Sequence, residues 1–144
     1  MICMSEQPSE DVKIPSGWVK QSHMQTFSGQ AGPYYFRERS NPTPGVGFFS
    51  EPRHANMGGV IHGGALMTLA DMSLWDICRR SVGDFMAVTV TLNAEFLNPG
   101  PIGEFIEASG QMTKGGKSLL FSQGLITAAG KPILSFSGSL KRLS

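Results

Sequence analysis

The feature that most constrains the fold of this chain is a predicted helix over residues 65–80 that is apolar on nearly every side. The segment contains no proline, and at the usual rise it spans about 24 Å. Its apolar residues include Leu66, Leu69, Ala70, Leu74, Ile77 and Cys78 on one broad side, with Met67, Met72 and Trp75 around the rest. Asp76 is expected to be a solvent or cap residue near its end. Such a helix has to be buried on nearly all sides, so the rest of the chain is expected to wrap around it.

The sequence after Gly83 changes from a helical period to a period of two. Residues 86–96 alternate between apolar and mostly polar side chains, which predicts a long strand with one apolar face. Glycine-containing turns separate the strands that follow. Further strands are expected at residues 33–39, 46–50, 104–112, 118–127 and 133–141, and a short helix is expected within residues 17–32.

This order of elements predicts an α+β fold, in which a curved antiparallel sheet wraps round one long central helix. A chain of 144 residues is most simply a single domain. We divide it into an N-terminal extension, residues 1–33, whose first 17 residues form a polar lead-in, and a main domain, residues 34–144. The exposed side of so small a unit is expected to pair with a second copy.

Composition excludes several classes of function. A net charge of +1 provides no electrostatic case for binding nucleic acid or an acidic membrane surface. Cys3 and Cys78 make neither a disulfide framework nor a zinc ligand set, and Cys78 is expected to be a buried free thiol. No secretory h-region and no membrane span stand out. A reducing cytoplasm is therefore the expected location, without nucleic acid or membrane as a partner.

The loop that leads into the helix carries the strongest functional signal. It contains Asn56 and His62, and the helix opens on Gly63 and Gly64. Backbone N–H groups at a helix start are unpaired, and glycines let an oxygen atom come close to them. The pattern is therefore either a loop that needs glycines or an oxyanion-stabilising helix start. A lone histidine in such a loop is most often satisfied by backbone groups.

Asp71 is the candidate general base, since apolar neighbours should leave its carboxylate poorly hydrated. The alternative is an aspartate on an exposed stripe of the helix. His62 and Asp71 are nine residues apart, which is about 13 Å along the helix and roughly half a turn out of phase. Either only one of them acts, or a second subunit completes the site.

Three other positions have both a functional and an ordinary interpretation. Thr89 lies on the polar face of its predicted strand, and threonine is a good strand former. Trp75, one turn beyond Asp71, is either a wall of a substrate pocket or a core residue. Gly116 and Lys117 form either a phosphate-binding turn or simply a turn.

These residues together resemble the signature of the hotdog-fold acyl-CoA thioesterases, within the 4-hydroxybenzoyl-CoA thioesterase superfamily. The signature is Asn56, Gly59, His62-Gly63-Gly64 and then Asp71. The segments at 87–93, 97–100 and 116–119 are also similar to the phenylacetate-pathway (PaaI-like) subgroup, so the likeness covers about residues 34–142.

The resemblance implies hydrolysis of an acyl-CoA or aryl-CoA thioester to the free acid and CoA. Asp71 would activate the attacking water with help from the Thr89 hydroxyl, and the Gly63 N–H would polarise the thioester carbonyl. Asn56 and His62 would position that carbonyl and the loop. Expected substrate contacts are Gly64, Trp75, Val88, Val90, Gly116 and Lys117.

The family pattern also implies an assembly. The site would lie at the interface of a homodimer, and two dimers would form a homotetramer. No metal and no separate cofactor are expected, since CoA is part of the substrate. Three rivals remain open: a hotdog hydratase or dehydratase, a non-catalytic acyl-CoA-binding module, and a structural oligomerisation domain.

Overall fold

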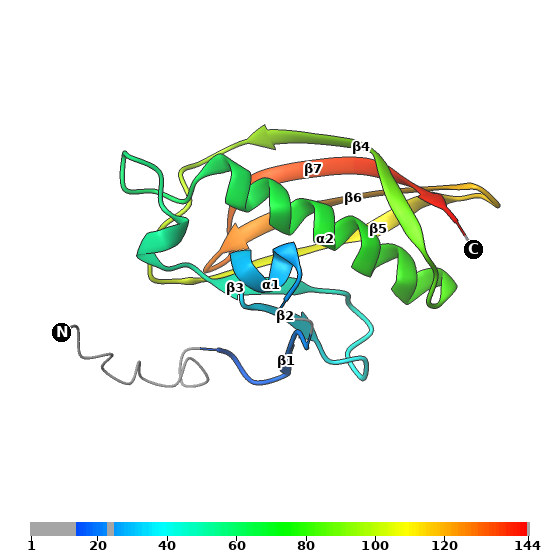
Figure 1. Cartoon of the computed structure of the whole chain (residues 1–144), viewed down its shortest axis with the longest axis horizontal. Coiled ribbons are helices and arrows are strands. Elements are labelled where there is room, and N and C mark those ends of the chain that lie inside the picture. Colours follow the sequence, from blue (N-terminus) through cyan, green and yellow to red (C-terminus); the bar gives the residue numbers. More distant parts are fainter. Residues whose placement is uncertain (1–13, 23–24, 144) are drawn as a thin grey trace.

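The computed structural model describes residues 14–22 and 25–143, in which one helix lies across a seven-stranded antiparallel sheet (Figure 1). The first 13 residues of the predicted lead-in lie outside the described residues. The elements in chain order are β1 (Trp18–Lys20), α1 (Phe27–Ala31), β2 (Tyr34–Arg37), β3 (Val46–Phe49), the 3₁₀ turn η2 (Pro52–His54), α2 (Gly63–Val82), β4 (Ala87–Phe96), β5 (Phe105–Gly115), β6 (Leu119–Ala128) and β7 (Lys131–Arg142).

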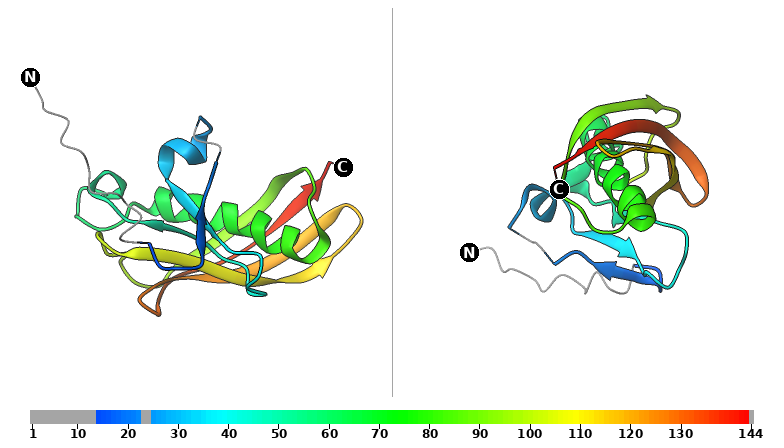
Figure 2. Two further views of the ribbon diagram at one scale, coloured as in Figure 1. Left: turned by 90° about the horizontal axis from the view of Figure 1, so that it is seen from below. Right: turned by 90° about the vertical axis from the view of Figure 1, so that its right-hand side faces the viewer.

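The sheet has the strand order β1-β2-β3-β5-β6-β7-β4, and every neighbouring pair is antiparallel. Figure 2 shows the sheet curling around α2, so the predicted fold class and all five further strands are confirmed. The expected short helix within residues 17–32 is confirmed at α1, and the same segment also adds β1 to the sheet edge.

Helix α2 is longer than the predicted 65–80 at both ends. It starts at Gly63 because the His62 side chain caps it, and it ends where Gly83 adopts a φ of 89°. Leu69, Ala70, Leu74 and Cys78 are fully buried against the concave face of the sheet. Burial raises the pKa of the Cys78 thiol, which is free as predicted.

The helix is not buried on nearly all sides, contrary to prediction. Gly64 is exposed, and Thr68, Asp71, Trp75 and Arg79 are partly exposed, so they form an open stripe along α2. The sheet covers only one side of the helix, and the N-terminal segment covers part of the other. The open stripe therefore keeps Asp71 accessible to a ligand.

The expectation that Asp76 is a solvent or cap residue is wrong. Its side chain is 2% exposed, pairs with Arg79 at 2.8 Å and accepts a hydrogen bond from the Gly45 N–H at 3.2 Å. Burial raises the pKa of Asp76, although the Arg79 guanidinium opposes this shift. The loop after β2 folds over the end of α2, where the Arg80 side chain donates to four of its carbonyl groups. Tertiary contact with a remote loop, invisible in the local pattern, therefore buries Asp76.

Strand β4 does not keep the single apolar face that was predicted from its alternation. A β-bulge shifts its register against β7 between Thr89 and Thr91, and this reverses which residues face the helix. Val88 and Val90 are consequently 49% and 54% exposed. No helix of the described residues is long and apolar enough to cross a membrane.

Candidate active site

The Asp71 carboxylate and the Thr89 hydroxyl form the centre of the candidate site. Thr89 Oγ1 donates a hydrogen bond of 2.6 Å to Asp71 Oδ1, which joins the open stripe of α2 to strand β4. The bulge next to Thr89 belongs to this arrangement, because it allows the residues on both sides of it to face the helix. The second carboxylate oxygen, Oδ2, remains available to accept a proton from water.

The start of α2 has the geometry of an oxyanion site. His62 Nδ1 accepts a hydrogen bond of 2.8 Å from the Gly64 N–H, so the histidine side chain serves as the helix cap. Among the described residues, no acceptor bonds the Gly63 N–H. A preorganised, unpaired N–H at the positive end of a 20-residue helix is suited to a developing negative charge.

Asn56 stabilises the loop in front of that helix start. Its Oδ1 accepts from the Gly58 N–H at 2.8 Å and from the Val60 N–H at 3.3 Å. Its backbone N–H donates to Val60 O at 2.8 Å. Asn56 thus closes a tight turn that shapes the loop ahead of Gly63.

One chain does not bring Asp71 and Gly63 together. They lie eight residues apart on the same straight helix, which is about 12 Å along its axis. Gly116 and Lys117 are farther away still, since the β5–β6 turn lies at the opposite end of the molecule from the start of α2 (Figure 1). Val88 and Val90 lie on β4 near Thr89, at the exposed edge of the sheet.

Two hollows flank the helix and the sheet. The first, of about 350 Å³, lies between α2 and strands β1 and β2, and Val19, Phe36, Trp75 and Arg79 contribute to its lining. The Arg79 guanidinium stacks 4.7 Å over the Trp75 ring, and Phe36 packs edge-on against the same ring. This hollow, which we call the Trp75 groove, begins one helical turn from Asp71. Trp75 therefore borders a hollow, as one of its two interpretations expected, and nothing in the sequence indicated that β1 supplies the opposite wall.

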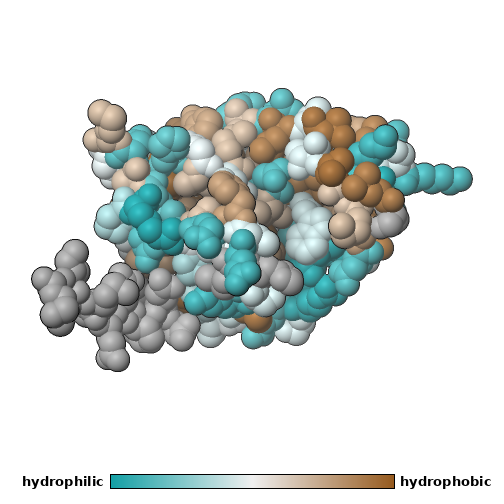
Figure 3. All heavy atoms as spheres, viewed as in Figure 1, coloured by the Kyte–Doolittle hydropathy of each residue, from teal (hydrophilic) through white to brown (hydrophobic). Residues whose placement is uncertain are grey.

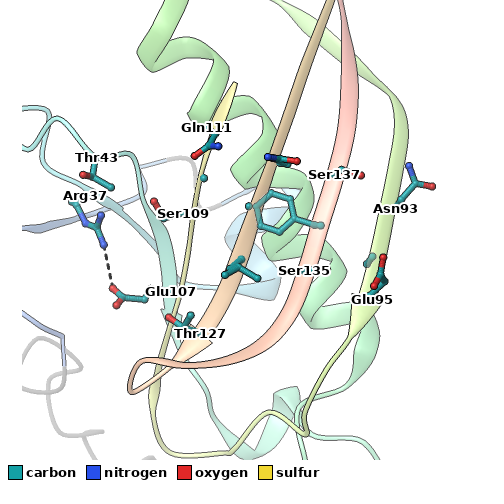
Figure 4. A pocket seen from close by; sticks show the side chains of 16 residues that line it. Arg37, Thr43, Asn93, Glu95, Glu107, Ser109, Gln111, Thr127, Ser135 and Ser137 are labelled. Carbon is teal, nitrogen blue, oxygen red and sulfur yellow. Dashed lines mark hydrogen bonds and ion pairs between the residues drawn. The ribbon is translucent and has the colours of Figure 1, made fainter. Parts of the chain in front are cut away.

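The second hollow, of about 770 Å³, lies on the opposite face of the sheet (Figure 4). Most of its lining residues are polar; they come from β4, β5, β6 and β7, together with Arg37 of β2 and Thr43 of the loop after β2. Arg37 and Glu107 pair across it at 3.4 Å. Asp71 and Thr89 do not line it, so it is separate from the candidate site. Within the described ranges, no three histidine, cysteine or acidic side chains lie close enough together to hold a metal ion.

Comparison with known proteins identifies the family of this chain. The family model described as the thioesterase superfamily matches residues 58–133, more than half of the chain. A putative esterase of Pseudomonas aeruginosa is 25% identical over 128 residues, covering 88% of this chain and 96% of that protein. Mouse acyl-coenzyme A thioesterase 13 is 36% identical over 76 residues, which cover 50% of this chain and 51% of that protein.

Solved structures share the fold. The E. coli PaaI protein of the phenylacetic acid degradation operon superposes with a TM-score of 0.72 at 22% identity, covering 83% of this chain and 86% of that one. A Bacillus halodurans protein solved with CoA has a TM-score of 0.69 at 25% identity, covering 76% and 73% of the two chains. The chain belongs to the thioesterase superfamily. The predicted hotdog-fold thioesterase is therefore confirmed as a class.

Proposed function

We propose that this protein hydrolyses acyl-CoA thioesters with Asp71 as the base that activates water. Asp71 Oδ2 takes a proton as the water oxygen attacks the thioester carbon, and the Gly63 N–H stabilises the oxyanion that forms. The carbon–sulfur bond then breaks, and the CoA thiolate takes up the proton, leaving free acid and CoA. The observation that carries this proposal is the 2.6 Å bond between Thr89 and Asp71, which orients a carboxylate on the open stripe of α2.

The proposal requires two subunits, and strand β4 supports their pairing. It is a ten-residue strand at the end of the sheet, with β7 as its one neighbour. It contains no proline and a single charged residue, Glu95. Edge strands that are protected against pairing usually carry several prolines or charged side chains. Apolar side chains gather beside it (Figure 3); Val82, Met86, Val88 and Val90 are all exposed there. A second copy of the chain is the proposed cover for this edge.

The two ends of β4 show how such pairing would complete the site. Thr89, near one end, holds Asp71. Phe96, at the other end, lies beside Gly63: a Cβ atom added to Gly63 would be 3.4 Å from the Phe96 ring. Antiparallel pairing of β4 with its copy around a two-fold axis would bring the Thr89 end of one strand beside the Phe96 end of the other. Asp71 of one subunit would then face Gly63 of the other, on both sides of the axis. Two such dimers form the proposed tetramer.

The Trp75 groove is the proposed site for the acyl group. It begins one turn from Asp71, and Val19, Phe36 and Trp75 supply apolar surface that suits a neutral acyl or aryl group. Its lining also includes charged side chains: Lys20, Arg37, Glu38, Arg39 and Arg79. Gly64, Val88 and Val90 are the proposed contacts at the thioester, and Gly116 and Lys117 of the partner are proposed contacts of CoA.

Hydrolysis itself is tested with a panel of thioesters. We expect turnover of at least one among short-chain, medium-chain, benzoyl and phenylacetyl-CoA, followed by release of thiol with a chromogenic disulfide reagent. The matching free acids should appear in equal amount by chromatography. Binding of CoA esters without any thiol release would instead identify a non-catalytic module.

Subunit sharing is tested by mixing two inactive variants. Asp71→Ala and Gly63→Pro chains are refolded together in equal amounts, and hybrids are separated with two different tags. If each site takes Asp71 from one chain and Gly63 from the other, a hybrid dimer has one intact site of two. Random pairing makes about half of the dimers hybrids, so the mixture should recover about a quarter of wild-type activity. Hybrids that form but show no activity would place both residues in one chain's site.

A further inference from the structure

His54 is a buried histidine that the mechanism above does not use. Its side chain is 6% exposed and packs edge-on against the Phe48 ring at 4.9 Å. Nδ1 accepts a hydrogen bond of 3.0 Å from the Glu51 N–H, so the ring proton is on Nε2. That Nε2–H donates to the Ala31 carbonyl, 2.7 Å away at the end of α1. The ring therefore bridges the N-terminal segment and the loop that starts at Glu51.

The backbone of the same residue belongs to the loop of residues 51–62 that leads into α2, which we call the oxyanion loop. The His54 carbonyl accepts a hydrogen bond of 2.8 Å from the His62 N–H, and Ala55 and Ile61 form a β-bridge beside it. His62 in turn caps α2, and Gly63 follows directly. A displacement of His54 would thus be transmitted over one hydrogen bond to the residue that precedes the oxyanion donor.

The surroundings keep this ring neutral. The elements packed against it, α1 and β3, contain no titratable side chain, and its charged neighbours are Glu51 and Arg53 of its own loop. Burial lowers the pKa of His54 below its ordinary value. A proton added at Nδ1 would face the Glu51 N–H, donor against donor, and would break that hydrogen bond.

We propose that His54 is a positioning residue, whose two ring hydrogen bonds use the N-terminal segment to hold the oxyanion loop and the Gly63 N–H in place. The inference rests on the proposed function, in which the Gly63 N–H stabilises the oxyanion. It assigns to α1, which the family signature does not include, a part in turnover. It also gives a functional reason for a buried histidine, although burial of this ring lowers the stability of the fold on acidification.

Three substitutions separate the two hydrogen bonds. In His54→Asn, the amide oxygen can replace Nδ1 as the acceptor for Glu51, but the link to Ala31 is lost. In His54→Gln, the amide nitrogen can reach the Ala31 carbonyl as Nε2 does. His54→Ala loses both bonds.

The expected order of kcat is wild type, then Gln, then Asn, then Ala. Because small displacements at a reacting centre cost up to about 100-fold, we expect a 10- to 100-fold loss of kcat for Ala and about 10-fold for Asn, with KM changed less than about threefold. Each rate is normalised to the folded fraction measured by circular dichroism at the assay temperature. Arg53→Gln is the matched control: it removes the other side-chain contact between this loop and α1, 3.0 Å to Gln30 O, but leaves the ring in place, and should keep kcat within about twofold.

The pH profile provides a readout that a purely structural role would not change. Wild-type kcat should fall on acidification below the ordinary histidine pKa, as Nδ1 becomes protonated and releases Glu51. His54→Asn has no ring to protonate, so its profile should lose this acid limb. An Asn variant with wild-type kcat and the same acid limb would overturn the inference.

Failure of this inference differs from failure of the proposed function. If the wild type hydrolyses thioesters and the His54 variants do so equally well, only the inference fails. If the wild type releases no thiol, amide hydrogen exchange still tests positioning: the His62 N–H should exchange at least about tenfold faster in folded His54→Ala than in wild type. Equal protection of the His62 amide in both would overturn the inference without any reference to activity.

Discussion

Asp71→Asn is expected to lower kcat for the best thioester substrate by about 1,000-fold, since a general base contributes 100- to 10,000-fold in comparable enzymes. Asparagine has nearly the same shape and still accepts the hydrogen bond from Thr89 Oγ1, so the fold and KM should change little. Its amide cannot take a proton from water. Steady-state kinetics on folded protein, with circular dichroism as the check on folding, measures the effect.

Asp84→Asn is the control for that substitution. Asp84 also pairs with one side chain, Arg39 at 3.1 Å, but it is 77% exposed and lies beyond the end of α2. Removal of an exposed ion pair is expected to leave kcat and stability within experimental error. Asp71→Asn protein that retains more than about a tenth of wild-type kcat would show that another group activates the water.

Gly63→Pro is expected to lower kcat by about 100- to 1,000-fold, the usual cost of removing one oxyanion donor. The substitution deletes the N–H and little else. Proline is well tolerated at the first position of a helix, and His62, with φ −59° and ψ 136°, already has the extended conformation that a residue before proline requires. The circular dichroism spectrum and melting temperature should therefore stay close to those of the wild type.

Gly63→Ala is the matched partner of that variant. Alanine places the same Cβ atom 3.4 Å from the Phe96 ring, an ordinary contact distance, but keeps the N–H. It should retain most of the wild-type kcat. If Ala and Pro lower kcat equally, the loss is steric, and the Gly63 N–H is not the oxyanion donor.

Hydrophobic periodicity determined most of this fold. The change from a helical period to a period of two after Gly83 predicted α2 and the strands β4 to β7 within a few residues of where they lie. The reason is that each pattern fits one regular backbone geometry and buries its apolar side only in that geometry. Local composition placed the start of α2 within two residues, since the glycines before residue 65 mark it, but the structure adds that the His62 side chain caps the helix at Gly63.

Position along the chain also determined that Asp71 and Gly63 cannot meet within one subunit, because the helical rise separates them by about 12 Å. Periodicity alone could not show that Thr89 meets Asp71; only the family resemblance implied that the Thr89 hydroxyl assists Asp71. That contact depends on the β-bulge after Thr89, and a bulge depends on the register between β4 and β7, whose paired residues are at least 38 positions apart (Phe96 and Leu134).

Tertiary structure alone decided the environment of three other residues. Asp76 is buried because a loop 31 residues away in the chain covers it, and Trp75 borders a groove because β1 joins the edge of the sheet. His54 links α1 to the loop after β3 because its ring forms hydrogen bonds with both the Glu51 N–H and the Ala31 carbonyl. Local periodicity reports which side of an element is buried against something. It does not report what covers that side, since the free energy of such contacts arises between segments far apart in sequence.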